Sequence, residues 1–299
     1  MRACAPAADG TVVQDGVTLH YEVYGAGATV LLLPTWTAVH KRCWKLQIPY
    51  LARHFRVVSY DGPGNGRADR PLDADPYGQA AQVAYALAVL DATHTERAVV
   101  VGLSRAANWA LGLAAAHPSR VAGLVAISPA LVLGKLEPWD LDARADLPPS
   151  AVPLGGRDPQ AHWAKYTRPY WLEHYDDFLW FFFGQCFTEP HSTKQIEDAV
   201  GWGQETDGAV LVAESHAPRP GKESVEEWLA RVDCPLLAIH GTDDGLVPTD
   251  RSEQLAARTG GELALLRGAG HLPNARDPVR VNLLIKDFVE RIHHESANT

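Results

Sequence analysis

One serine, Ser104, stands in the sequence pattern that a nucleophilic hydroxyl requires. It follows three valines, Val99 to Val101, and precedes the helix-forming run 106–116, so a strand, a sharp turn and a helix are predicted with the hydroxyl at the tip of the turn. Such a turn strains the serine backbone, and the residues two positions before and after it must be small. Gly102 and Ala106 meet this demand, with Ala106 in place of the usual second glycine. A match of five residues is weak by itself, so the rest of the chain must decide whether this serine is catalytic.

A serine hydroxyl becomes nucleophilic at neutral pH when a hydrogen-bonded base takes its proton and an acid orients that base. Two late loops offer these groups in the order acid, then histidine. The strand predicted over 235–240 runs into a loop with Asp243 and Asp244, and the next predicted strand runs into the glycine-flanked His271. Because carboxyl ends of parallel strands meet at one edge of a sheet, we expect such groups to gather near Ser104.

The elements that must position these residues alternate along the chain. Two alternating runs around Asp15-Gly16 predict a hairpin. Further strands are predicted at 30–33, 55–60, 98–103, 121–127, 235–240 and 263–266, and helices at 77–90, 106–116 and 278–293. Strands that alternate with helices favour an α/β fold, here a mostly parallel, doubly wound sheet that carries an N-terminal hairpin.

One segment, 130–232, interrupts this alternation. No clear strand is predicted there, and aromatic residues concentrate in it, from Trp139 onward and including the run Phe181 to Phe183. We interpret it as a mainly helical insertion, with 1–129 and 233–299 forming the core domain. Most of its aromatic side chains are expected to build its own core. Three consecutive phenylalanines on a helix cannot all face one way, so at least one is expected to point toward a cleft or a partner surface.

Together these features resemble the α/β-hydrolase fold family over nearly the whole chain. Gly102-Leu103-Ser104-Arg105-Ala106 matches its nucleophile elbow, the loop from Gly241 to Pro248 its acid loop, and Gly270-His271 its histidine loop. The resemblance implies a nucleophile, an acid and a base, which are Ser104, Asp244 and His271.

The acid of this set has more than one candidate. Asp243 is a second candidate, and Asp244 has a non-catalytic alternative as a cap for a helix that starts near Thr249. The other acid position of the family follows the strand 121–127. Ser128-Pro129 offers no carboxylate there, which favours Asp244.

The resemblance also implies an oxyanion hole, formed by the backbone amides of Trp36 and Arg105. Pro34-Thr35 stands where the family usually has His-Gly, so a plain turn is the alternative. The glycine-rich loop 61–67 resembles one that supports the oxyanion loop. It is not a phosphate loop, because no Gly-Lys-Ser/Thr follows it.

By position, the insertion 130–232 corresponds to the family's cap over the catalytic face, where an apolar pocket receives a small molecule. Our candidate substrate contacts are Trp36, Trp171 and Phe182. His40, just after the oxyanion loop, either contacts substrate or serves at the surface or as a helix cap.

Composition limits partners and location. A net charge of −9 disfavours nucleic acid and anionic membranes. No window approaches the roughly 18 apolar residues that span a bilayer, and the N-terminus lacks the apolar core of a signal peptide, so a cytoplasmic location is expected. The His, Asp and four Cys residues do not have the spacing of metal ligands, so no metal is expected. The sequence has no dinucleotide-binding motif, so no cofactor is expected either. A monomer and a homodimer both fit.

The sequence therefore predicts a serine hydrolase that cleaves a carboxylic ester, lactone or thioester of a moderately apolar small molecule through an acyl-enzyme. Cleavage of C–C bonds, peracid formation and acyl transfer use the same residues. The serine at position 104 disfavours chemistry that needs an aspartate nucleophile. A non-catalytic ligand-binding protein is the alternative of a different class, and the complete set of three residues argues against it.

Overall fold

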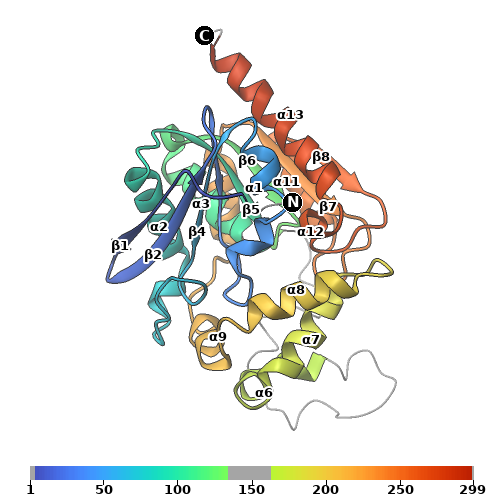
Figure 1. The fold of residues 1–299 in the computed structure, drawn as a ribbon. Coiled ribbons are helices and arrows are strands. Elements are labelled where there is room, and N and C mark those ends of the chain that lie inside the picture. The colour runs from blue at the N-terminus through green and yellow to red at the C-terminus, as the bar shows by residue number, and fades with distance from the viewer. Residues whose placement is uncertain (1–3, 134–162, 298–299) are drawn as a thin grey trace.

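The alternating and β-branched runs form one eight-stranded sheet in the computed structural model, which describes residues 4–133 and 163–297 (Figure 1). The strands are β1 (Ala8–Gln14), β2 (Val17–Tyr24), β3 (Thr29–Leu32), β4 (Arg56–Asp61), β5 (Ala98–Leu103), β6 (Val121–Ile127), β7 (Leu236–Gly241) and β8 (Glu262–Leu266). Their order across the sheet is β1-β2-β4-β3-β5-β6-β7-β8. Among the strands of the described residues, the pairs β1–β2 and β2–β4 are antiparallel and the other five pairs are parallel. The predicted mostly parallel sheet with an N-terminal hairpin is confirmed.

The hairpin turn explains the Asp-Gly pair in the sequence. Asp15 and Gly16 have φ angles of 50° and 79°, and positive φ at both central residues is the geometry of a tight turn whose twist matches the strands it joins. The turn fixes the register in which Gln14 pairs with Val17.

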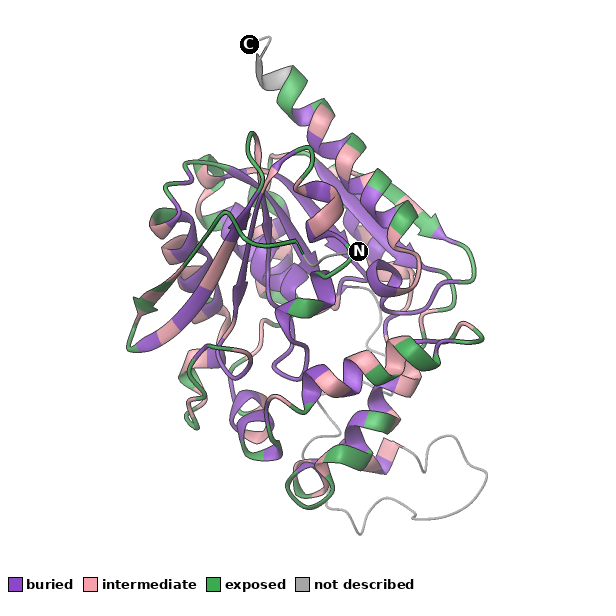
Figure 2. Cartoon of the chain, viewed as in Figure 1, coloured by how far each residue is buried: buried purple, intermediate pink, exposed green. Residues whose placement is uncertain are grey.

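Helices cover both faces of the sheet. On one side lie α2 (Gln79–Ala92), α3 (Ala106–Ala116), α10 (Lys222–Arg231) and α11 (Asp250–Thr259). On the other lie α1 (Ile48–Leu51), α12 (Pro273–Arg276) and α13 (Pro278–Ala297). Successive residues of β5 face opposite sides, Val100 toward the first layer and Val101 toward the second. Every residue of β5 is buried, as the purple central strands of Figure 2 show, so the strand that leads to Ser104 is packed on both faces.

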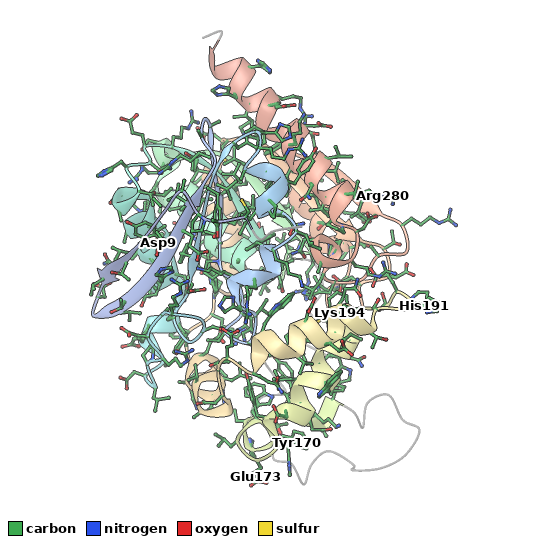
Figure 3. The ribbon with its side chains drawn as sticks, in the orientation of Figure 1. Asp9, Tyr170, Glu173, His191, Lys194 and Arg280 are labelled. Carbon is green, nitrogen blue, oxygen red and sulfur yellow. The ribbon has the colours of Figure 1, made fainter. Side chains whose placement is uncertain are left out.

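Four further helices lie together beyond one edge of the sheet, at the bottom of Figure 1. They are α6 (Arg168–Glu173), α7 (Tyr175–Cys186), α8 (Thr193–Gly203) and α9 (Gly208–Ser215). Aromatic side chains fill the space between them, and Trp171, Phe178 and Phe183 are almost completely buried. On the outside, Glu173 and His191 point away from the protein (Figure 3), and the apolar side chains of Leu172 and Trp180 are exposed as well.

These four helices are our proposed cap. The predicted insertion ended at residue 232, but α10 packs on α3 through Val225 and Leu229 and so lies in the helical layer of the sheet. We therefore propose that the cap ends with α9. Trp139 and the rest of 134–162 lie outside the described residues.

No helix in the two described parts of the chain is both long and apolar enough to cross a membrane. The four cysteines, Cys4, Cys43, Cys186 and Cys234, are free thiols.

Candidate active site

Ser104 lies at the tip of a strained turn between β5 and α3. Its φ angle is 55°, in the left-handed region, and its amide donates to the carbonyl of Ile127 at 2.8 Å. The turn brings two backbones so close that a Cβ atom on Gly102 would lie 2.7 Å from the carbonyl oxygen of Ala106. That contact is with backbone, which cannot easily move, and it explains why the sequence has glycine at position 102.

The structure brings together the three residues that the sequence singled out. His271 Nε2 lies 2.9 Å from Ser104 Oγ, and His271 Nδ1 lies 2.7 Å from Asp244 Oδ2. The three come from the loops after β5, β7 and β8, as the parallel topology requires. Asp243, the other candidate acid, is exposed and accepts a hydrogen bond from its neighbour Thr242.

The carboxylate of Asp244 is fully satisfied although its side chain is buried. Oδ1 accepts hydrogen bonds from the amides of Leu246 and Val247, at 2.8 and 2.9 Å. Oδ2 accepts from His271 and from a second histidine, His240, at 3.0 Å. Burial alone would raise the pKa of Asp244, but the two histidines outweigh it and hold the pKa well below its usual value. The acid is therefore ionised throughout the neutral range and can stabilise a protonated His271.

His240 is a part of the site that the sequence analysis did not identify. It is completely buried at the end of β7, and its Nε2 lies 3.0 Å from both Asp244 Oδ2 and the carbonyl of Val247. A carbonyl can only accept, so Nε2 carries a proton. Nδ1 lies 2.7 Å from the hydroxyl of Ser252. The one signal in the sequence is its place four residues before Asp244.

The loop that follows β3 places the amide of Trp36 near the serine turn. The hydroxyl of Thr35 donates to the carbonyl of Leu103 at 2.8 Å, which ties this loop to the last residue of β5. Threonine in place of the family's usual glycine thus adds an anchor. Among the described residues, the amide of Trp36 has no acceptor, as an oxyanion donor requires.

The glycine-rich loop after β4 supports the loop that carries Trp36. Asn65 donates from its side-chain amide to the carbonyl of Thr37 at 2.6 Å. Gly64 has a φ angle of 94°, and a Cβ atom there would overlap the side chain of Thr37 at 1.9 Å. These contacts agree with the structural role that the sequence predicted for this loop.

His40 follows the same loop and acts as a helix cap. It precedes the short 3₁₀ helix η1 (Lys41–Trp44), and its Nδ1 accepts from the amide of Arg42 at 2.9 Å. Of the two roles left open by the sequence, this is capping; His40 does not line the cavity described below. Its burial lowers its pKa from 6.5 to about 4, although the carboxylate of Asp61 at 3.5 Å opposes this shift. An Nδ1 atom that accepts a hydrogen bond is also the sign of a neutral ring.

Because the pKa of His40 is lower in the folded protein, acid should destabilise the fold through this residue. The unfolded chain binds a proton near pH 6.5 and the folded chain near pH 4, so the stabilisation exists above pH 6.5 and is lost as the pH falls toward 4. His40→Asn keeps a capping oxygen but does not titrate. Between pH 6.5 and 4 we expect its free energy of unfolding to fall by about 1–3 kcal/mol less than that of the wild type. Urea unfolding of both proteins between pH 7 and 4 measures it, and parallel curves would contradict the expectation.

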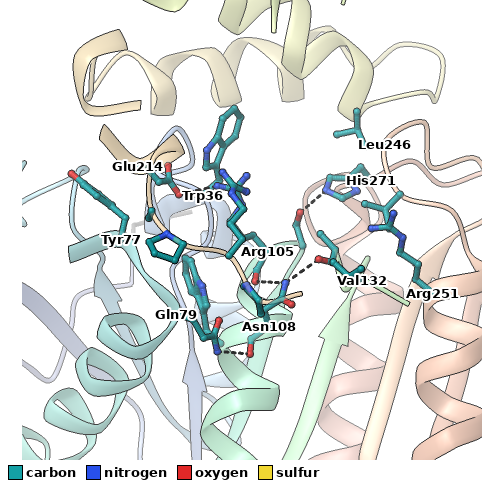
Figure 4. A pocket seen from close by; sticks show the side chains of 18 of the residues that line it. Trp36, Tyr77, Gln79, Arg105, Asn108, Val132, Glu214, Leu246, Arg251 and His271 are labelled. Atoms are coloured by element: carbon teal, nitrogen blue, oxygen red, sulfur yellow. Dashed lines mark hydrogen bonds and ion pairs between the residues drawn. The ribbon is translucent and has the colours of Figure 1, made fainter. Parts of the chain in front are cut away.

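Ser104 and His271 open onto a cavity of about 150 Å³ between the sheet edge and the proposed cap (Figure 4). Trp36, Tyr166 and Phe182 form an apolar part of its wall, and the rings of Trp36 and Phe182 lie 4.7 Å apart. Of the three consecutive phenylalanines, Phe182 is thus the one that faces the cleft. Leu246, beside the acid, continues the apolar surface.

The prediction for Trp171 is wrong. Its side chain does not line this cavity but lies almost completely buried among the aromatic side chains of the proposed cap, with its ring 5.1 Å from that of Tyr166 and 5.5 Å from that of Phe178. Tyr166 takes the place on the wall that the sequence analysis gave to Trp171. Packing within the cap decided between the two, and the sequence spacing carries no signal for it.

The cavity also has a charged part that the sequence analysis missed. Glu214 of α9 accepts from the guanidinium of Arg105 at 3.1 Å and from the amide of Thr37 at 3.3 Å. Burial raises the pKa of Glu214, while Arg105 and Arg219 oppose the rise. Glu214 thus connects the proposed cap to the residue after Ser104 and to the residue after Trp36.

Comparison with known proteins gives a family match over most of the chain. The model described as alpha/beta hydrolase fold matches residues 28–278. The chain is also 28% identical over 286 residues to the 2-hydroxymuconate semialdehyde hydrolase of Pseudomonas sp. strain CF600, a match that covers 93% of this chain and 92% of that protein.

Solved structures show the same architecture. An esterase from Exiguobacterium antarcticum superposes with a TM-score of 0.77 at 17% identity, covering 92% of this chain and 97% of the esterase. The enol-lactonase from Burkholderia xenovorans LB400 gives 0.74 at 21% identity, covering 94% of this chain and 100% of the lactonase. At these identities the likeness establishes the shared fold.

Proposed function

The chain belongs to the α/β-hydrolase fold family, and from this premise we propose that it is a serine hydrolase that cleaves a carboxylic ester of a moderately apolar small molecule. One observation carries the proposal. The hydroxyl of Ser104, the ring of His271 and the carboxylate of Asp244 form a continuous hydrogen-bonded chain whose serine end opens into a cavity.

In the proposed reaction, Ser104 Oγ attacks the ester carbonyl while His271 Nε2 takes its proton. Asp244 holds the Nδ1 proton of His271 and stabilises the imidazolium that forms. The amides of Trp36 and Arg105 bind the oxyanion of the tetrahedral intermediate. The alcohol leaves with the proton from His271, and the same nitrogen then activates water to release the acid from the acyl-enzyme.

The wall of the cavity supports a substrate with an apolar body. Aromatic rings of Trp36, Tyr166 and Phe182 face the space next to Ser104, and burial of apolar area favours larger acyl or alcohol groups by about 25 cal/mol per Å². Acetate esters leave much of this wall uncovered.

A chain-length panel with lactones included tests the proposal. We expect medium-length and aromatic 4-nitrophenyl esters to be hydrolysed with a kcat/KM about tenfold or more above that of the acetate, and a fluorophosphonate to label the protein covalently. If an ester substrate slows the labelling, then hydrolysis and labelling take place at the same site. A chain that neither reacts with the probe nor cleaves any ester would instead support a ligand-binding protein.

C–C bond hydrolysis is a second candidate for the same residues. The Pseudomonas relative, which matches over nearly its whole length, is named as a hydrolase of 2-hydroxymuconate semialdehyde. A ring-opened semialdehyde of that kind belongs in the same panel, and a preference for it over every ester would favour this candidate.

A further inference from the structure

Arg251, on the wall of the cavity that holds Ser104, is a cation to which no described side chain is paired. It lies in the first turn of α11, a few residues after the loop of Asp244, and lines the cavity together with His271. Figure 4 shows Arg251 and His271 on the same side, opposite Tyr77 and Glu214. The chain thus places a guanidinium beside the residues proposed to act on the substrate.

In the parts of the chain that the structure describes, no carboxylate forms an ion pair with Arg251 and no side chain hydrogen-bonds to it. Its Nε atom is buried and has no acceptor. A buried donor without an acceptor costs free energy, more so in a charged group, so native proteins rarely keep one without a reason. Arg251 lines the cavity, where a ligand can supply an acceptor to its guanidinium.

The other charged side chains that line the cavity do not supply an acceptor for Arg251. Three arginines, Arg105, Arg219 and Arg251, and one acidic side chain, Glu214, belong to its described lining. Glu214 is hydrogen-bonded to Arg105 and is also under the influence of Arg219. The described lining therefore carries more positive than negative charge in a protein whose net charge is −9, and Arg251 is the arginine of this lining that no carboxylate of the described residues pairs with.

We propose that Arg251 binds a carboxylate carried by the substrate, so that the preferred esters are half-esters of dicarboxylic acids or similar acidic esters. A guanidinium matches the planar fork of a carboxylate with two parallel hydrogen bonds. A single unpartnered guanidinium suits a monoanion better than a phosphate dianion. The apolar wall opposite would cover the body of the same molecule. This inference rests on the proposed hydrolase function.

The test compares two acyl groups of equal length, one with a terminal carboxylate and one with a terminal methyl. We expect the ratio of kcat/KM for mono-4-nitrophenyl glutarate to that for 4-nitrophenyl pentanoate to fall roughly ten- to a hundredfold in Arg251→Gln. The loss should fall mainly on KM, because the contact is remote from the reacting carbonyl and is equal in the ground and transition states. Succinyl and adipyl half-esters beside glutaryl show which reach fits.

Arg258→Gln is the matched control. Arg258 lies on the same helix but pairs with Glu226 on the outside, so this change removes the same charge without touching the cavity, and the ratio should stay as in the wild type. Arg251→Lys keeps the charge but loses the fork and should fall between. An unchanged ratio in Arg251→Gln, while the pentanoate is still cleaved, overturns the inference alone. Absence of cleavage and of fluorophosphonate labelling in the wild type overturns the hydrolase proposal instead.

Discussion

Ser104→Ala should lower kcat for the best ester substrate by about 10⁴-fold or more. The hydroxyl is the attacking atom in the proposed reaction, and the residual rate would come from the oxyanion amides and from binding alone. Fluorophosphonate labelling should disappear with it. The fold should remain, because alanine keeps the Cβ atom and the backbone hydrogen bonds of this residue, and among the described residues the Ser104 hydroxyl is hydrogen-bonded to His271 alone.

Ser128→Ala provides a matched control for that experiment. Ser128 directly follows the neighbouring strand β6 and has a φ angle of 44°, and its buried hydroxyl has no hydrogen-bond partner among the described residues. Its loss removes the same atom from the same kind of strained turn but not from the proposed nucleophile, so activity should stay within about threefold of the wild type. Substantial ester hydrolysis by Ser104→Ala would overturn the assignment of the nucleophile.

Asp244→Asn should cost about 10³- to 10⁴-fold in kcat, for a reason visible in its hydrogen bonds. Each carboxylate oxygen accepts two N–H groups, from two amides on one side and two histidines on the other. An asparagine has one oxygen and one NH₂ group. Its NH₂ group must therefore face either the two backbone amides or the two histidines, and both of these pairs donate hydrogen bonds to the present carboxylate. If the oxygen stays with the amides, His271 must accept at Nδ1, and its proton moves to Nε2, which can then no longer receive the proton of Ser104.

Asp243→Asn is the control that separates the two neighbouring acids. Asp243 is exposed and bonds to Thr242, so its replacement should leave kcat within about threefold of the wild type. Steady-state kinetics of both variants, with thermal melting to confirm folding, measures the difference. A larger loss in the Asp243 variant would reverse the assignment of the acid.

The parts of the molecule that short-range patterns determine were predictable from the sequence. A valine run, a small residue on each side of Ser104 and a helix-forming run describe the turn completely, because its strain is local. The loops of Asp244 and His271 follow from the same logic, since parallel strands bring their carboxyl ends to one edge. The family match and the observed sheet confirm the fold.

Contacts between distant segments were not predictable. Arg105 and Glu214 are 109 positions apart, and no spacing in the sequence predicts the hydrogen bond between them. His240 belongs to a buried strand in which any apolar residue would have fitted the pattern. Both Trp171 and Tyr166 are buried, but Tyr166 lines the cavity and Trp171 does not. Which of the two reaches the cavity depends on the packing of all the helices of the proposed cap.

The proposed cap is fastened to both loops that flank Ser104. The carbonyl of Cys186, the last residue of α7, accepts a hydrogen bond from the amide of His271 at 2.9 Å. The carboxylate of Glu214 in α9 accepts a hydrogen bond from the amide of Thr37. The rates of hydrogen exchange at the amides of His271 and Thr37 therefore report whether the proposed cap keeps these two hydrogen bonds. If the proposed cap were exchanged for that of a relative, both contacts would change, one to a backbone carbonyl and one to a side-chain carboxylate, so substrate range and turnover number would change together.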